Sequence, residues 1–91
     1  MSVTPYLVVR GGARAIDFYT SAFGAEEIFR MTDPSDGRVG HAELSVSGST
    51  VMLADEYPDF GAVSPDALGG SPITLHMATQ TVDADVARAI Q

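Results

Sequence analysis

The chain contains no cysteine and no lysine. Without cysteine, a disulfide framework and thiolate chemistry are excluded. Five arginines stand against twelve acidic residues, which gives a formal net charge of −7 at pH 7. The arginines are scattered along the sequence and form no basic patch of the kind that a phosphate backbone or an anionic membrane would bind. We therefore expect neither a nucleic-acid partner nor a membrane partner.

Long apolar runs are also lacking, since no stretch approaches the ~20 residues that cross a bilayer. The first five residues show neither the basic head nor the apolar stretch of a secretory signal, so we expect a cytoplasmic protein. Hydrophobic residues nevertheless make up 45% of the 91 residues. This content is sufficient for one small domain with a packed core.

Apolar residues spaced three and four apart predict a helix near the start of the chain. Ile16, Tyr19 and Phe23 form one apolar stripe, and Gly24 supplies the left-handed backbone that commonly ends a helix. Alternating and β-branched stretches before and after it predict strands. We expect strands at residues 3–10, 26–31, 38–47, 50–54 and 72–79, and helices at 13–23 and 83–90.

The stretch 38–47 alternates between apolar and polar side chains, which is typical of a strand with two different faces. Ala42, Leu44 and Val46 should face the first helix. His41 and Glu43 then project from the opposite face, where they are expected to line a hollow.

The order of strand, short loop and helix occurs twice, at residues 3–23 and again at 72–90. Three strands follow the first helix, whereas nothing follows the second. We therefore expect one domain over 1–91 with a first βαβββ module at 3–56, a linking loop at 57–71 and the start of a second module at 72–91. By analogy with the first module, roughly 40 to 50 residues would complete the second.

Several short stretches in this order resemble the vicinal oxygen chelate superfamily, which includes glyoxalase I, bleomycin-resistance proteins and extradiol dioxygenases. The resemblance is strongest to its PhnB-like branch, with the second module truncated. The stretches are Thr4-Pro5-Tyr6-Leu7-Val8-Val9, Ala15-Ile16-Asp17-Phe18-Tyr19, Ala22-Phe23-Gly24-Ala25, Gly40-His41-Ala42-Glu43-Leu44 and Val51-Met52-Leu53-Ala54-Asp55-Glu56.

The resemblance implies an α+β fold in which βαβββ modules build a mixed, curled sheet around a cup. It also implies metal ligands on the first, fourth, fifth and eighth strands in the metal-dependent members. By spacing, Thr4, Leu53 and Thr74 occupy the first three of these positions, and none is a histidine or a glutamate. We therefore expect no metal cofactor at the family's positions, although a divalent metal held elsewhere stays open.

The side chains expected to line the cup are those that share its face in this arrangement. They are Tyr6, His41, Glu43, Leu53, Thr74 and His76. His41, Glu43 and His76 together could form an alternative, displaced metal site. The ordinary alternative is a polar sheet face that is satisfied by water.

Asp55 and Glu56 follow each other at the end of the strand 50–54. Paired carboxylates can divide acid–base work between them. Neighbours in sequence usually point apart, however, and we interpret these two as a solvated strand end.

These observations predict a protein that binds a small organic ligand in a sheet-lined cup without a metal. The alternatives are a metal-dependent lyase, isomerase or dioxygenase with relocated ligands, and a truncated remnant without activity. Because an incomplete module leaves apolar surface and strand edges uncovered, we also expect a homodimer that exchanges the strand 72–79 and the second helix. Neither the ligand nor any turnover is specified by the sequence.

Overall fold

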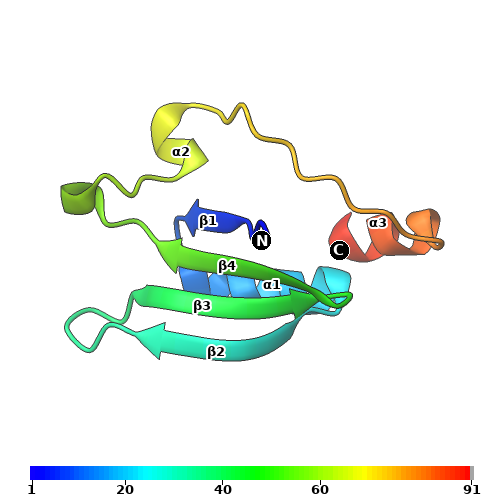
Figure 1. Cartoon of the computed structure of the whole chain (residues 1–91), viewed down its shortest axis with the longest axis horizontal. Coiled ribbons are helices and arrows are strands. Elements are labelled where there is room, and N and C mark those ends of the chain that lie inside the picture. Colours follow the sequence, from blue (N-terminus) through cyan, green and yellow to red (C-terminus); the bar gives the residue numbers. More distant parts are fainter. Residues whose placement is uncertain (91) are drawn as a thin grey trace.

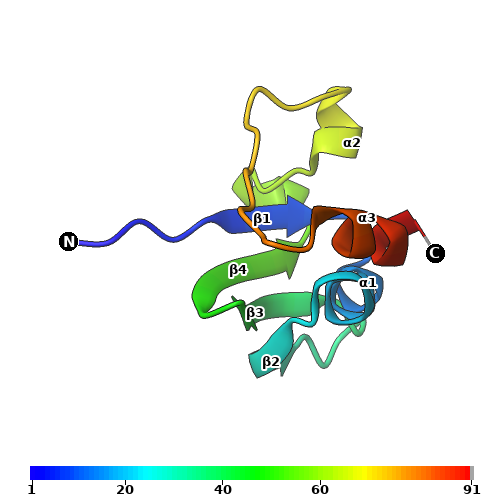
Figure 2. The ribbon, with the colours of Figure 1, turned by 90° about the vertical axis from the view of Figure 1, so that its right-hand side faces the viewer.

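Four strands form one mixed sheet, and two of the helices pack against each other on one side of it (Figures 1 and 2). The computed structural model describes residues 1–90. The elements are β1 (Tyr6–Val9), α1 (Gly12–Phe23), β2 (Glu26–Thr32), β3 (Val39–Val46), β4 (Ser49–Asp55), the short 3-10 helix η1 (Pro58–Phe60), α2 (Pro65–Leu68) and α3 (Val82–Ile90). None of the helices among residues 1–90 is both long and apolar enough to cross a membrane.

The strand order is β1-β4-β3-β2, with β1 parallel to β4 and the remaining pairs antiparallel. Parallel strands need a crossover connection, and α1 belongs to the crossover between β1 and β4. The elements from β1 to β4 therefore form the βαβββ arrangement expected from the sequence, within an α+β fold.

The register of the strands divides the side chains between two faces of the sheet. Leu53 aligns with Leu7 on one side and with Ala42 on the other, and these three residues face α1. Because successive side chains alternate, the neighbouring positions face away from the helix. We call this second surface the open face; it carries Tyr6, Phe29, Met31, His41, Glu43 and Met52.

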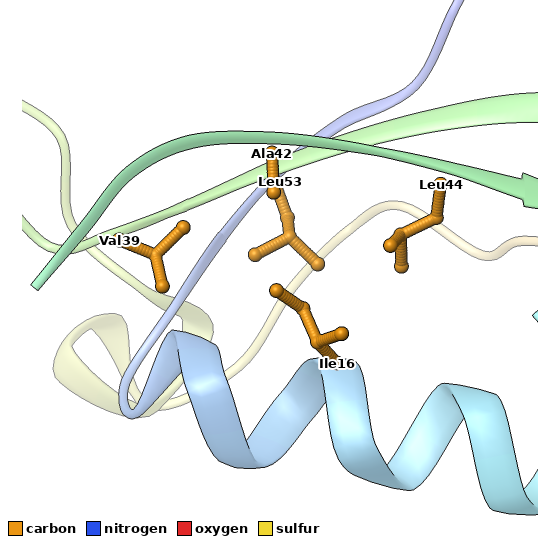
Figure 3. Packing of buried hydrophobic residues seen from close by; sticks show 5 residues of the cluster. All are labelled: Ile16, Val39, Ala42, Leu44 and Leu53. Atoms are coloured by element: carbon orange, nitrogen blue, oxygen red, sulfur yellow. The ribbon is translucent and has the colours of Figure 1, made fainter. Parts of the chain in front are cut away.

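The hydrophobic core lies between α1 and the sheet. Ile16 of α1 points toward four buried side chains of the two central strands, as Figure 3 shows. These four are Val39, Ala42, Leu44 and Leu53, each without exposed surface. The apolar stripe predicted for the helix is thus the stripe that builds the core.

The start of α1 comes very close to the ends of β3 and β4 at Gly12. A Cβ atom at this position would stand 2.8 Å from Oδ2 of Asp55 and 3.0 Å from Cβ of Val39. Real Cβ atoms do not approach a carboxylate oxygen so closely, so the turn between β1 and α1 requires a residue without a side chain.

Replacing Gly12 by alanine should therefore lower the free energy of unfolding, by about 1–3 kcal/mol for an overpacked buried position. Gly40→Ala is the matched control, because a Cβ there would lie 3.7 Å from its nearest neighbours, an ordinary contact distance. Urea unfolding of both variants measures the difference. Equal stability of the two variants would contradict the close packing at Gly12.

The prediction of a strand at residues 72–79 is wrong. In Figure 1 these residues form an extended connection between α2 and α3; they belong to no sheet, and all of them are exposed. A strand is stabilised by a partner that accepts and donates its backbone hydrogen bonds, and none of the four strands in the described part of the chain pairs with this segment. The sheet is also open rather than curled into a half-barrel.

The second predicted helix is present as α3, and it packs against α1. The predicted loop 57–71 contains the short helices η1 and α2. Ser64 begins α2, where its hydroxyl oxygen accepts a hydrogen bond from the backbone N–H of Ala67. The assignment of 72–91 to the start of a second module stays a prediction.

Candidate functional site

Three polar side chains meet on the open face, and all three were expected there. The hydroxyl of Tyr6 in β1 lies 2.9 Å from Nδ1 of His41 in β3, so this hydrogen bond spans β4. Nε2 of His41 lies 3.8 Å from Oε2 of Glu43. The His41 and Glu43 side chains are 24% and 34% exposed, so they are accessible without being fully solvated.

Apolar side chains surround this polar cluster on the same face. Phe29 and Met31 of β2 align with Glu43 and His41, respectively, and both are about half exposed. The rings of Phe29 and His41 have centroids 6.1 Å apart. Met52 of β4 aligns with Glu43 and with Tyr6, which places it between them. A few hydrogen-bonding groups within an apolar border are typical of small-molecule sites.

The contacts of His41 favour one arrangement of protons when the ring is neutral. An ionised carboxylate only accepts hydrogen bonds, so the nitrogen that faces Glu43, Nε2, is the one that best carries hydrogen. Nδ1 is then an acceptor, and the Tyr6 hydroxyl donates to it. The Tyr6 hydroxyl is thus hydrogen-bonded directly to the His41 ring, whereas the Glu43 carboxylate lies near the ring but beyond hydrogen-bond distance.

Leu53 does not lie with these residues, contrary to the prediction. It is fully buried in the core, where its side chain faces Ile16 of α1 (Figure 3). The physical reason is the two-residue repeat of a strand: Leu53 pairs with Ala42, so it shares the helix side of the sheet with Ala42. Met52, its neighbour, takes the place on the open face.

Thr74 and His76 lie in the exposed segment 72–79 and not in the sheet. His76 lines a separate cleft of about 1370 Å³, whose wall also includes Tyr19 of α1 and Val86 of α3. Both helices lie on the side of the sheet opposite the open face (Figure 2). The predicted grouping of His76 with His41 is therefore not formed.

Metal ligands do not converge in the part of the chain that the structure describes. Among residues 1–90, no group of three or more histidine, cysteine, aspartate or glutamate side chains could hold a metal ion. Thr4 precedes β1 and is exposed. The displaced site proposed from His41, Glu43 and His76 thus lacks one of its three ligands.

Asp55 is buried, at 8% exposure, which corrects the interpretation of a solvated strand end. Its Oδ1 accepts hydrogen bonds from the backbone N–H groups of Gly11 and Gly12, at 3.0 and 2.8 Å. Its Oδ2 accepts from the N–H of Val39 at 2.7 Å. One carboxylate therefore joins the end of β4 to the start of α1 and the start of β3. All of its recorded hydrogen bonds go to the backbone, which indicates a structural role.

Glu56 joins a different pair of segments. It accepts hydrogen bonds from Nε of Arg10, and from the backbone N–H and the hydroxyl of Ser64, each at 2.9 Å. The hydrogen bond from Arg10 and those from Ser64 stabilise the ionised carboxylate and lower the pKa of Glu56 from 4.5 to about 2. These bonds anchor the start of α2 beside the end of β1, so Glu56 also has a structural role.

The lowered pKa of Glu56 predicts a specific pH dependence of stability. Because the folded-state pKa lies below the unfolded-state value, the contribution of Glu56 is complete above about pH 4.5 and disappears as the pH falls toward 2. In urea unfolding, the stability difference between the wild-type chain and Glu56→Gln should therefore shrink between pH 5 and pH 2. Glu26→Gln, at an exposed position, serves as the control. A difference that stays constant over this range would contradict the prediction.

Comparison with known proteins agrees with this geometry. Residues 3–91 match the family model described as "Glyoxalase/Bleomycin resistance protein/Dioxygenase superfamily". The chain belongs to this superfamily. The resemblance recognised in the sequence is thereby confirmed for nearly the whole chain.

Two curated relatives of this superfamily member come from mycobacteria. Mb0911c of Mycobacterium bovis is 44% identical over 92 residues, which cover 98% of this chain and 60% of the relative. Rv0887c of Mycobacterium tuberculosis is 44% identical over the same length, covering 98% of this chain and 54% of the relative. The chain thus spans little more than half the length of these relatives.

Several solved structures have a similar fold. A gene product of Arabidopsis thaliana, At5g48480, has a TM-score of 0.77 and 28% identity over 99% of this chain and 70% of its own. The PhnB protein of Bacillus cereus has a TM-score of 0.57 and 26% identity over 63% of this chain and 50% of its own. The fosfomycin resistance protein FosX of Listeria monocytogenes, at 14% identity and a TM-score of 0.59 over 97% of this chain and 67% of its own, shares the fold alone.

Proposed function

We propose that this superfamily member binds a small organic molecule on the open face of its sheet, without a metal ion. One observation carries the proposal: the hydrogen bond between Tyr6 and His41 joins two strands, with Glu43 beside it, on a face that α1 leaves uncovered. Polar groups set in this way fix the orientation of a ligand, and the apolar side chains around them supply contact area.

Exposure of the apolar side chains supports this proposal. Tyr6 is 49%, Phe29 47% and Met31 53% exposed, and all three lie on the same face. Single exposed apolar residues are normal, whereas a group of them beside polar side chains marks a surface that something else covers. A ligand that covers these side chains would remove apolar area from water and form hydrogen bonds with the polar side chains of the cluster.

A fragment screen followed by NMR titration of the ¹⁵N-labelled chain tests the proposal. Bound fragments should shift amide signals of β1, β3 and β2, and His41→Ala should abolish these shifts, whereas His76→Ala should leave them unchanged. At a hundred times its dissociation constant, a ligand should also stabilise the fold by about 2.7 kcal/mol in thermal unfolding. The fragment shifts should persist in EDTA.

Two results would overturn the proposal. One is a screen in which no fragment shifts the signals of the open face. The other is elemental analysis that finds one metal ion per chain, lost in His41→Ala, together with fragment binding that EDTA abolishes. The second result would restore the alternative of a metal-dependent lyase, isomerase or dioxygenase.

A homodimer is the second part of the proposal. Ile73, Leu75 and Met77 in the extended segment 72–79 are 70%, 52% and 52% exposed, and the segment is paired with no strand among residues 1–90. An extended apolar segment of this kind is readily paired by a second copy of the chain. Sedimentation equilibrium should give twice the 9.5 kDa mass of the chain. A stable, folded monomer at tens of micromolar would remove this part of the proposal.

A further inference from the structure

The open face offers two hydrogen-bond acceptors, the Tyr6 oxygen and the Glu43 carboxylate, and the six residues that define it include no arginine. From this we infer that the ligand is an organic amine, bound as its ammonium ion on an apolar body. The inference rests on the proposed ligand site and adds the chemical class of the molecule. It follows from three features of the cluster, which are the proton of Tyr6, the charge of Glu43 and the surrounding rings.

The first feature is the proton of Tyr6. The phenol donates it to Nδ1 of His41 in the arrangement that Glu43 favours, so the phenol cannot donate to a ligand at the same time. The Tyr6 oxygen keeps its lone pairs, which are free to accept. A group with N–H or O–H bonds satisfies them, whereas a carbonyl or a carboxylate would bring one acceptor against another.

The second feature is the carboxylate of Glu43. The 3.8 Å between its Oε2 and Nε2 of His41 exceeds the length of a direct hydrogen bond, so the carboxylate keeps acceptor capacity for a ligand. Its side chain is also only one-third exposed, so water screens it incompletely. A cation beside it gains a charge-assisted hydrogen bond, whereas an anion is repelled.

Three arginines at or beside the strands are engaged elsewhere and do not offset this negative charge. Arg38, just before β3, pairs with Asp36. Arg30 of β2 aligns with Ala42, on the helix side of the sheet. Arg10, at the end of β1, is held by Glu56. The net charge of −7 acts in the same direction, because it draws cations toward the surface and repels anions.

The third feature is the aromatic border. The rings of Tyr6 and Phe29 lie on either side of His41, with centroids 5.5 and 6.1 Å from that of the imidazole. Aromatic faces attract ammonium groups, and with Met31 and Met52 they cover the apolar part of the same molecule. An ammonium ion with an apolar body therefore matches the Tyr6 oxygen, the Glu43 carboxylate and the apolar border of this face.

Three probes of similar size separate the amine from other ligands. They are 2-phenylethylammonium, 2-phenylethanol and 3-phenylpropanoate, titrated against the ¹⁵N-labelled chain at constant ionic strength. The ammonium probe should shift signals of the open face and bind roughly tenfold more tightly than the carboxylate, the range expected for a charge-assisted hydrogen bond. The alcohol should fall between them.

Single-residue variants test whether Tyr6 and Glu43 cause the preference for the ammonium probe. Glu43→Gln should remove the advantage of the ammonium probe over the alcohol, whereas Asp17→Asn, which removes the same charge from an exposed site on α1, should preserve it. Tyr6→Phe should weaken the binding of both the ammonium probe and the alcohol probe, because the oxygen that accepts their hydrogen bonds is lost. A dispersed ¹H–¹⁵N spectrum confirms that each variant is folded before titration.

The outcomes separate this inference from the function on which it rests. The inference of an amine ligand is overturned if the carboxylate probe or the alcohol probe binds the open face as tightly as the ammonium probe. It is also overturned if Glu43→Gln leaves the preference for the ammonium probe unchanged. In both cases the proposed ligand site stands. If no probe shifts the open face, both fail.

Discussion

Replacement of Asp55 by alanine is expected to destabilise this protein more than any other single change we consider. The buried carboxylate accepts three backbone hydrogen bonds from two chain segments, the start of α1 and the start of β3. Its removal leaves three backbone N–H groups without this acceptor, two of them buried, which should lower the free energy of unfolding by about 3–5 kcal/mol. Since small domains are stable by only about 5–15 kcal/mol, the variant should be partly unfolded at 37 °C.

Asp55→Asn provides the informative comparison, because it keeps the shape of the side chain and one accepting oxygen. The remaining oxygen can serve Gly11 and Gly12, while the amide group faces the N–H of Val39, where two donors meet. We expect intermediate stability. Asp59→Ala, at an exposed residue of η1, is the control. Urea unfolding that places Asp55→Ala within error of Asp59→Ala would refute the structural role of Asp55.

Leu53→Ala is expected to have the second largest effect. Leu53 is fully buried against Ile16, and truncation of such a leucine leaves a cavity that lowers the free energy of unfolding by about 2–5 kcal/mol. Ligand binding on the open face should change little in the fraction that stays folded, because Leu53 points to the other side of the sheet.

Met52→Ala is the matched variant on the neighbouring position. Met52 is half-buried on the open face, between Tyr6 and Glu43. We expect a change in stability of about 1 kcal/mol or less, and weaker binding of the aromatic probes. Thermal unfolding and NMR titration of the two variants measure both effects. The reverse pattern, with Leu53→Ala stable but impaired in binding, would mean that the register of β4 is wrong.

Local pattern was sufficient to predict the βαβββ module. The stripe of Ile16, Tyr19 and Phe23 defined the helix, and the alternation around His41 and Glu43 defined the two faces of β3. Both signals depend only on the geometry of a single helix or strand, so they can be recognised without knowing what packs against them. Tyr6 and His41 were expected on the same face of the sheet, although the hydrogen bond between them was not expected.

The errors arose where a residue's environment depends on distant parts of the chain. Leu53 was assigned to the cup by spacing, yet its pairing with Ala42 decides its side of the sheet. The alternation of Ile73, Leu75 and Met77 predicted a strand that has no partner within residues 1–90. Asp55 looked like a solvated carboxylate because its hydrogen-bond donors lie 16 or more residues away in the sequence.

The sequence by itself determined the order of the elements from β1 to β4, the superfamily and the excess of acidic over basic residues, since composition and periodicity are properties of local stretches of chain. The tertiary structure decided which side chains meet, because the alignment of β1 with β4, more than forty residues apart, brings Tyr6 within reach of His41 and Asp55 within reach of the start of α1. Strand register is fixed by how all four strands and α1 pack at once, and a shift of one residue would exchange the two faces of the sheet.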